Sequence, residues 1–265
     1  MQPEIDLFGL PLQTFGLMLG LAFLCSGAIA SRRLAEIGRP PDWVYEMVFA
    51  ALVGGIVGAR VWWLAEHLDQ VTEDPLGSLF SGSGLVFYGG ALGGAVAVVG
   101  WALRKRVLGL WLLDLAAAPL AIGYAVGRIG CQLSGDGDYG VASDLPWAMA
   151  YPEGTVPTTV EVHPTPVYET LSMAVVTLGL WHLRDRVRPG GVLACWLVLA
   201  GVERFLVEFV RRNDEVVSGL TQPQLIAAAM TLGGLFWLWR LSRGGGVRVS
   251  PARPAAPTAP AARPA

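Results

Sequence analysis

Charged residues are scarce in this chain. Only 15% of its 265 residues are Asp, Glu, Lys or Arg, whereas 53% are hydrophobic and the mean hydropathy is +0.50. A soluble domain would carry about 25% charged residues. The apolar residues also form runs about as long as the roughly 20 residues that a helix needs to cross a bilayer. The scarcity of charge therefore argues against an ordinary soluble domain and indicates a protein whose solvent is lipid.

Cysteine is scarce as well, and its spacing shows no pairs. Cys25, Cys131 and Cys195 form no CxxC motif, and two of them fall inside apolar runs. A disulfide framework is therefore not expected, and Cys25 and Cys195 are interpreted as small apolar packing residues. We expect neither a metal nor a cofactor, and no nucleic-acid partner.

Seven apolar stretches, separated by polar or Gly/Pro-rich breaks, predict seven transmembrane helices. The expected fold is thus an all-α integral membrane protein. The stretches cover about residues 12–30, 44–64, 84–103, 111–130, 166–183, 191–209 and 222–241.

The distribution of basic residues predicts the orientation. Fourteen of the 19 lie in the loops after the first, third and fifth stretches or after the seventh. The opposite side carries acidic residues, with only Arg211 and Arg212 as bases. The positive-inside rule then places the N-terminus in the periplasm and the C-terminus in the cytoplasm of a bacterial inner membrane.

Two segments are not expected to be membrane helix. Residues 131–164 contain no Lys or Arg and many Gly, Pro and acidic residues, which predicts a small periplasmic cap on the transmembrane domain 1–242. Residues 243–265 are rich in Pro and Ala and predict a disordered cytoplasmic tail.

Five ionisable residues fall within the predicted helices near their outer ends: Arg60, Arg128, Glu169, Arg204 and Glu208. A charge at a helix centre costs about 2.5–3.5 kcal/mol, so partners or a water-filled cavity are expected. Interhelical salt bridges or snorkelling side chains would explain them structurally. A cavity with excess positive charge at headgroup depth would instead suit a phosphate, which arginine binds in bidentate fashion.

Three motifs resemble the prolipoprotein diacylglyceryl transferase family. GRIGCQLSGDGDYG (127–140) is similar to the family's GRIGNFINGE, HPTPVYE (163–169) to HPSQLYE, and ERFLVEFVRRND (203–214) to FRFLVEFFREPD. Weaker matches are FGLM (15–18), GARVWW (58–63) and GLVFYGG (84–90). They occur in the family's order over roughly residues 10–242.

The resemblance implies a reaction and its partners. The family transfers the diacylglyceryl group of phosphatidylglycerol to the lipobox cysteine in the signal peptide of a prolipoprotein. A thioether forms and glycerol phosphate leaves. Both substrates would reach the site from the membrane lipids.

The resemblance also implies roles for individual residues. Arg128 matches an arginine expected to bind the phosphate, and Arg204 one expected to assist the leaving phosphate. Glu208 is expected to orient Arg204, and Glu169 matches the glutamate of HPSQLYE. The other substrate-binding positions implied are Arg60, Cys131, Ser134, Gly140 and His163, the last of which could equally be a loop-capping residue.

The chain departs from the family at several of these positions. Tyr88 stands where the family has a histidine with a catalytic role, and tyrosine, with an unperturbed pKa near ~10, is a poor base at neutral pH. Cys131 and Ser134 replace two asparagines. The motif is one residue longer and places Asp136 and Asp138 near the usual glutamate. The phosphate side of the site is thus kept, while the acceptor side differs.

Three functions are therefore compatible with the sequence. The first is an active transferase that handles protons through Glu169 or Tyr88. The second is a paralogue that binds a phospholipid headgroup without catalysis, or acts on another acceptor. The third is a small lipid or anion transporter, which the absence of paired broken helices disfavours.

Overall fold

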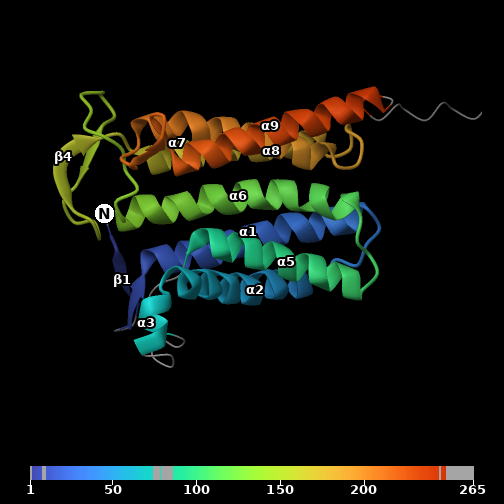
Figure 1. Ribbon diagram of the computed structural model, residues 1–265, viewed down its shortest axis with the longest axis horizontal. Helices are drawn as coiled ribbons and strands as arrows, with labels where there is room; N and C mark the ends of the chain where they lie inside the picture. The colour runs from blue at the N-terminus through green and yellow to red at the C-terminus, as the bar shows by residue number, and fades with distance from the viewer. Residues whose placement is uncertain (1, 8–9, 74–77, 79–85, 245, 249–265) are drawn as a thin grey trace, which may run out of the picture.

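Long helices lie side by side in the computed structural model of the chain (Figure 1). The structure describes residues 2–7, 10–73, 78, 86–244 and 246–248. In this part of the chain seven helices have 17 to 25 residues. They are α1 (Thr14–Glu36), α2 (Trp43–Glu66), α5 (Phe87–Arg104), α6 (Leu110–Ser134), α7 (Thr165–Leu183), α8 (Gly191–Val207) and α9 (Gln222–Arg243).

Each predicted apolar stretch coincides with one of these helices. Four of them, α1, α2, α6 and α9, are long and apolar enough to cross a membrane, and α5 contains a shorter apolar stretch, Gly89–Arg104. Many large apolar side chains face outward, among them Leu24, Phe49 and Leu178, which are about 70% exposed. The chain is therefore a mostly helical membrane protein.

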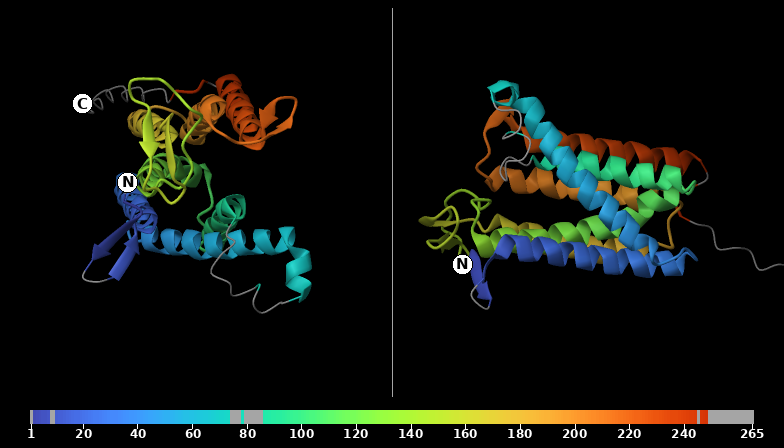
Figure 2. Two further views of the ribbon diagram at one scale, coloured as in Figure 1. Left: turned by 90° about the vertical axis from the view of Figure 1, so that its left-hand side faces the viewer. Right: turned by 90° about the horizontal axis from the view of Figure 1, so that it is seen from below.

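Helix α6 lies in the middle of the bundle. Helices α7, α8 and α9 lie on one side of it, and α1, α2 and α5 lie on the other (Figures 1 and 2). Because α6 faces both groups, much of its surface is buried, including Ala117, Ala121 and Ala125.

Glycines bring α2 and α5 into close contact. A Cβ atom on Gly93 would overlap the carbonyl oxygen of Gly54, and one on Gly58 would overlap the carbonyl oxygen of Gly89. Small residues at such spacing let helix backbones approach closely in lipid, where packing rather than water exclusion holds helices together.

Short elements gather at one end of the bundle, the left-hand end in Figure 1. Their bounds are β1 (Glu4–Leu7), β2 (Leu10–Gln13), α3 (Leu68–Glu73), β3 (Met149–Tyr151), β4 (Thr158–Val162), η1 (Glu208–Val210), β5 (Glu215–Val217) and β6 (Leu220–Thr221). The strands pair as the antiparallel hairpins β1–β2, β3–β4 and β5–β6.

The segment between α6 and α7 folds as a cap around the β3–β4 hairpin. The rings of Tyr139 and Tyr151 stack with centroids 4.7 Å apart and, with Val162, form the core of the cap. Helix α6 continues to Ser134, so Cys131 and Ser134 lie in its last turn and the predicted start of the loop at residue 131 is wrong. Gly135 ends the helix with φ of +60°, a conformation that favours glycine.

At the opposite end of the bundle, the segment after α9 contacts the segment between α7 and α8. Arg188 Nη1 donates to the carbonyl of Gly244 at 2.5 Å, and Val187 forms a bridge with Arg248. The rest of the predicted tail, residues 245 and 249–265, lies outside the described residues.

Candidate functional site

Glu169 on α7 is the centre of a buried ionic network. Its side chain is 0% exposed. Oε1 accepts hydrogen bonds from the Tyr124 hydroxyl at 2.6 Å and from Arg204 Nη1 at 3.2 Å. Oε2 lies 3.3 Å from Arg211 Nη1 and 3.1 Å from Arg128 Nε. A carboxylate has about four lone-pair positions, and three of those on Glu169 accept hydrogen bonds while Arg128 adds an ion pair.

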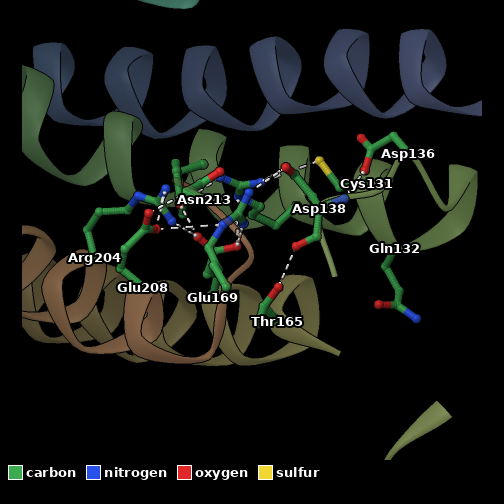
Figure 3. Close-up of polar contacts among 12 residues, drawn as sticks. Cys131, Gln132, Asp136, Asp138, Thr165, Glu169, Arg204, Glu208 and Asn213 are labelled. Carbon is green, nitrogen blue, oxygen red and sulfur yellow. Dashed lines mark hydrogen bonds and ion pairs between the residues drawn. The ribbon is translucent and has the colours of Figure 1, made fainter. Parts of the chain in front are cut away.

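Asp138 joins the cap to this network, on the side opposite Glu208 in Figure 3. One of its oxygens contacts Arg128 Nη1, and the other lies 2.5 Å from Arg211 Nη2. The Thr165 hydroxyl donates a hydrogen bond of 2.5 Å to the backbone carbonyl of Asp138. Burial acts to raise the pKa of the Asp138 carboxyl, but the charges of Arg128 and Arg211 outweigh it, so the pKa lies below its usual value.

Glu208 closes the network at the end of α8. Its Oε2 lies 2.8 Å from Arg204 Nη2, and its Oε1 accepts from Asn213 at 2.6 Å and from the Thr221 hydroxyl at 2.8 Å. The carboxylate therefore orients Arg204 and also ties α8 to the segment that leads into α9.

The charges in this network balance. Arg128, Arg204 and Arg211 are matched by Asp138, Glu169 and Glu208. Among the described residues the network itself therefore carries no excess of positive charge, as in the interhelical salt bridges that the sequence also allows. The third carboxylate comes from the cap, whose fold the sequence did not reveal.

Arg211 occupies the place in the network that the sequence assigned to Arg60. It was predicted to lie in an outer loop, but α8 gives way to η1 at Glu208 and the next turn returns the Arg211 side chain to the site, where it is 8% exposed. Arg60, on α2, is buried against the Trp63 ring at 4.6 Å and contacts the carbonyl of Ser78. Among the described contacts, none joins Arg60 to Glu169 or Asp138.

Two other predicted positions are placed beside the network. The Sγ of Cys131 lies 3.7 Å from Arg128 Nη1. The Ser134 hydroxyl donates to the Cys131 carbonyl at 3.3 Å and thus faces its own helix. Tyr88 lies in the first turn of α5, and its side chain is outside the described part of the chain.

Cys131, Asp136 and Asp138 form a group whose potential ligand atoms lie within 4.8 Å of one another. Such spacing could hold a metal ion, but Asp138 already pairs with two arginines, which disfavours a further cation there. Burial also raises the pKa of the Asp136 carboxyl and so favours its neutral form.

Gly140 and His163 hold the cap against the bundle. The Gly140 N–H donates to the His163 carbonyl at 2.8 Å, and the Val141 N–H donates to the Val210 carbonyl at 2.8 Å. A Cβ atom on Gly140 would overlap the Val210 carbonyl. The His163 ring lies 3.2 Å from the Tyr168 hydroxyl. Within the described contacts, neither residue reaches the arginines.

Sequence reasoning missed Tyr124, Asp138 and Arg211 as members of the site. Tyr124 precedes Arg128 by four residues, and such residues share a helix face, so this signal was available. Its hydroxyl accepts from Arg128 Nη2 at 3.1 Å. The network as a whole fixes three guanidinium groups close together, and fixed guanidinium groups suit the recognition of phosphate.

A bundle of apolar helices with an arginine–carboxylate network at one end defines the class: a helical membrane protein with a charged site. The sequence profile of the prolipoprotein diacylglyceryl transferase family matches residues 4–240. The chain belongs to this family, as the motif resemblance predicts.

Individual relatives agree with this assignment. A protein of Clostridium tetani is 29% identical over 240 residues, covering 89% of this chain and 96% of its own. Proteins of Chromohalobacter salexigens and Pseudomonas fluorescens are each 32% identical, covering 88% and 97% of this chain and 91% and 98% of their own. All three are named phosphatidylglycerol–prolipoprotein diacylglyceryl transferase.

Proposed function

We propose that the chain transfers the diacylglyceryl group of phosphatidylglycerol to the lipobox cysteine of prolipoproteins. The observation that carries this proposal is the network in which Glu169 fixes Arg128, Arg204 and Arg211. Family membership supplies the reaction, and the network supplies groups for its phosphate.

The arginines have separate tasks in this proposal. Arg128, held by both Glu169 and Asp138, binds the lipid phosphate. Arg204 lies between Glu169 and Glu208 and stabilises the charge that grows on the departing phosphate. Glu169 and Glu208 are positioning residues, since they act through the arginines.

The reaction forms one bond and breaks one. The sulfur of the acceptor cysteine, as thiolate, attacks the carbon of the diacylglyceryl unit that is bonded to the phosphate oxygen. A C–S bond forms, the C–O bond breaks, and glycerol phosphate leaves with the electron pair. The thiol proton must pass to a base.

Tyr88 is the proposed proton-handling group. Glu169 accepts three hydrogen bonds and pairs with three arginines, which stabilise its ionised form and leave it poorly placed to take a proton. Replacement Tyr88→His restores the family's histidine and is expected to raise the transfer rate, whereas Tyr88→Phe removes the hydroxyl and is expected to lower it. An unchanged rate in both variants would rule out this role for Tyr88.

We further propose that all seven long helices span the bacterial inner membrane, with the N-terminus and cap in the periplasm. The basic residues support this orientation, since Arg33, Arg104, Arg184 and Arg243 lie at the C-terminal ends of α1, α5, α7 and α9. These helices end on the side of the bundle opposite the cap (Figure 1). Green fluorescent protein fused to the C-terminus should fluoresce, and alkaline phosphatase fused there should be inactive.

The function is tested by incubating purified protein with labelled phosphatidylglycerol and a lipobox peptide. Label should appear in the peptide and be absent when serine replaces the lipobox cysteine. Binding of phosphatidylglycerol without transfer to any lipobox peptide would support the alternative, a paralogue that binds the headgroup or uses another acceptor.

A further inference from the structure

A cavity of about 300 Å³ lies between the cap and the segment that follows η1. It adjoins the ionic network, since Asp138 and Arg211 belong to both. Its lining residues are Gly137, Asp138, Tyr139, Arg211, Arg212 and Asn213.

Arg212 differs from the other arginines of this region. Its guanidinium stacks on the Tyr139 ring at 4.3 Å, and Nη2 donates to the Gly137 carbonyl at 3.2 Å. It makes no ion pair with a carboxylate of the described chain. Arginine has five N–H donors, so most of those on Arg212 remain available, and its charge is not neutralised as that of Arg211 is.

Arg212 also differs from the residue at the corresponding position of the family motif. The family pattern FRFLVEFFREPD has glutamate where this chain has Arg212, so this position of the motif carries a cation in place of an anion. With Asp138 and Arg211 balancing each other, Arg212 gives the cavity a net positive charge.

The proposed reaction creates an anion that needs such a cation. The phosphate of phosphatidylglycerol is a diester with one negative charge. The glycerol phosphate that leaves is a monoester with a second pKa near ~6, and it carries about −1.5 to −2 at neutral pH. Arg204 stabilises this charge as it develops, but every arginine of the network is already paired with carboxylates, so a cation beside the network that has no carboxylate partner is suited to hold the released monoester.

We propose that this cavity is a binding subsite for a glycerol phosphate monoester, with Arg212 as its principal cation. The inference rests on the proposed function, which supplies the ligand. The subsite would receive the leaving group beside the network and hold it before release to water. A phosphate on glycerol is also the headgroup of phosphatidylglycerol, and the experiment separates the two.

The test measures binding without turnover. Full-length protein is placed in phosphatidylcholine nanodiscs without acceptor peptide, and glycerol phosphate is titrated while binding is followed by ³¹P NMR. Arg212→Gln should weaken binding at least tenfold, Arg212→Glu should abolish it, and Arg212→Lys should retain part of it. Because no transfer is involved, failure here is distinct from failure of the proposed function.

Arg243→Gln is the matched control. Arg243 also stacks on an aromatic ring at 4.3 Å, that of Trp239, but it is the last residue of α9, which ends on the side of the bundle opposite the cap (Figure 1). The Arg243→Gln variant should bind glycerol phosphate with the affinity of the wild type. Thermal unfolding of each variant shows that the fold is intact.

A second arm repeats the titration with phosphatidylglycerol in the nanodiscs. The proposal is supported if Arg212→Gln weakens binding of glycerol phosphate and leaves that of phosphatidylglycerol within twofold of wild type. Equal weakening of both would place the lipid headgroup in the cavity and overturn the subsite as one for the monoester. Wild-type affinity of Arg212→Gln for glycerol phosphate would overturn it entirely.

Discussion

The Tyr124 hydroxyl donates a hydrogen bond of 2.6 Å to Oε1 of Glu169 and thereby joins α6 to α7 inside the arginine network. Tyr124 also accepts from Arg128 Nη2 at 3.1 Å, so one hydroxyl orients both the carboxylate and one of its cations. The arginines are thus fixed before any substrate arrives, which is the condition for electrostatic stabilisation of a developing charge.

Replacement Glu169→Gln should destabilise the protein strongly. It preserves the shape of the side chain but leaves three arginines without their shared carboxylate, and breaking a buried ion pair costs about 3–5 kcal/mol. Tyr124→Phe removes the two hydrogen bonds of the hydroxyl, to Glu169 and from Arg128, but leaves every ion pair in place, so it should destabilise the protein less than Glu169→Gln does. Thermal unfolding in detergent measures both.

The exposed Glu153 supplies the control for this pair. Glu153→Gln should unfold like the wild type. Equal stability of Glu169→Gln and Glu153→Gln would show that Glu169 does not hold the network together.

Replacement Gly140→Ala should separate the cap from η1. The added methyl group would overlap the Val210 carbonyl and crowd the His163 Cβ atom at 2.9 Å, and neither backbone can yield without breaking the Val141–Val210 hydrogen bond. Because Asp138 is two residues away, transfer activity should fall at least tenfold, a barrier increase of about 1.4 kcal/mol. Gly179→Ala on α7 meets nothing within 4 Å and should keep full activity.

Replacement Gly93→Ala should loosen the contact between α2 and α5. Overpacking of a close contact costs about 1–3 kcal/mol, and the new methyl group would meet the backbone of Gly54 and Gly58. Gly100→Ala lies on the same helix with open space around it and is the control. An unfolding temperature for Gly93→Ala equal to that of Gly100→Ala would contradict the glycine-mediated packing.

Stability should depend on acid through Asp138. Arg128 and Arg211 lower the pKa of this carboxyl in the folded state. The ionised carboxylate therefore contributes fully to the free energy of unfolding when the pH is above its pKa in the unfolded chain, about 4. This contribution is lost as the pH falls through the lower pKa of the folded state. The unfolding temperature of Asp138→Asn should therefore lie below that of the wild type from pH 7 to pH 5, and the gap should narrow below about pH 4.

Asp144 is the comparison for this experiment, since it is exposed and forms no ion pair within the described chain. The unfolding temperature of Asp144→Asn should equal that of the wild type at every pH. A gap for Asp138→Asn that stays constant down to pH 2 would mean that the ionised carboxylate is not what stabilises the fold.

The helices were predictable because their signal is local. Each apolar stretch is long enough to predict a helix without information from the rest of the chain, and all seven coincide with helices of the structure. The ends were less predictable: Cys131 and Ser134 belong to α6, because the helix stops only where Gly135 adopts a positive φ.

The site was predictable only where helices carry it. Arg128, Glu169, Arg204 and Glu208 lie at one end of their helices, so their convergence followed from the topology. Asp138 and Arg211 are placed by the fold of the cap and by the change from α8 to η1, which depend on contacts between distant segments such as Val141 with Val210. No pattern within the sequence reports those contacts.

Arg128 is the residue on which binding of the lipid phosphate should depend most directly. The measurement is transfer of labelled diacylglyceryl from phosphatidylglycerol to a lipobox peptide by wild type, Arg128→Lys and Arg128→Ala, with phosphatidylglycerol binding measured in parallel. Lysine keeps the charge but lacks the planar fork that contacts Asp138 and Glu169 together. Both variants should lose transfer by about 10²-fold or more, as expected when the group that positions the reacting phosphate is lost or displaced, and alanine should also weaken lipid binding. Transfer by Arg128→Ala at the wild-type rate would contradict the account.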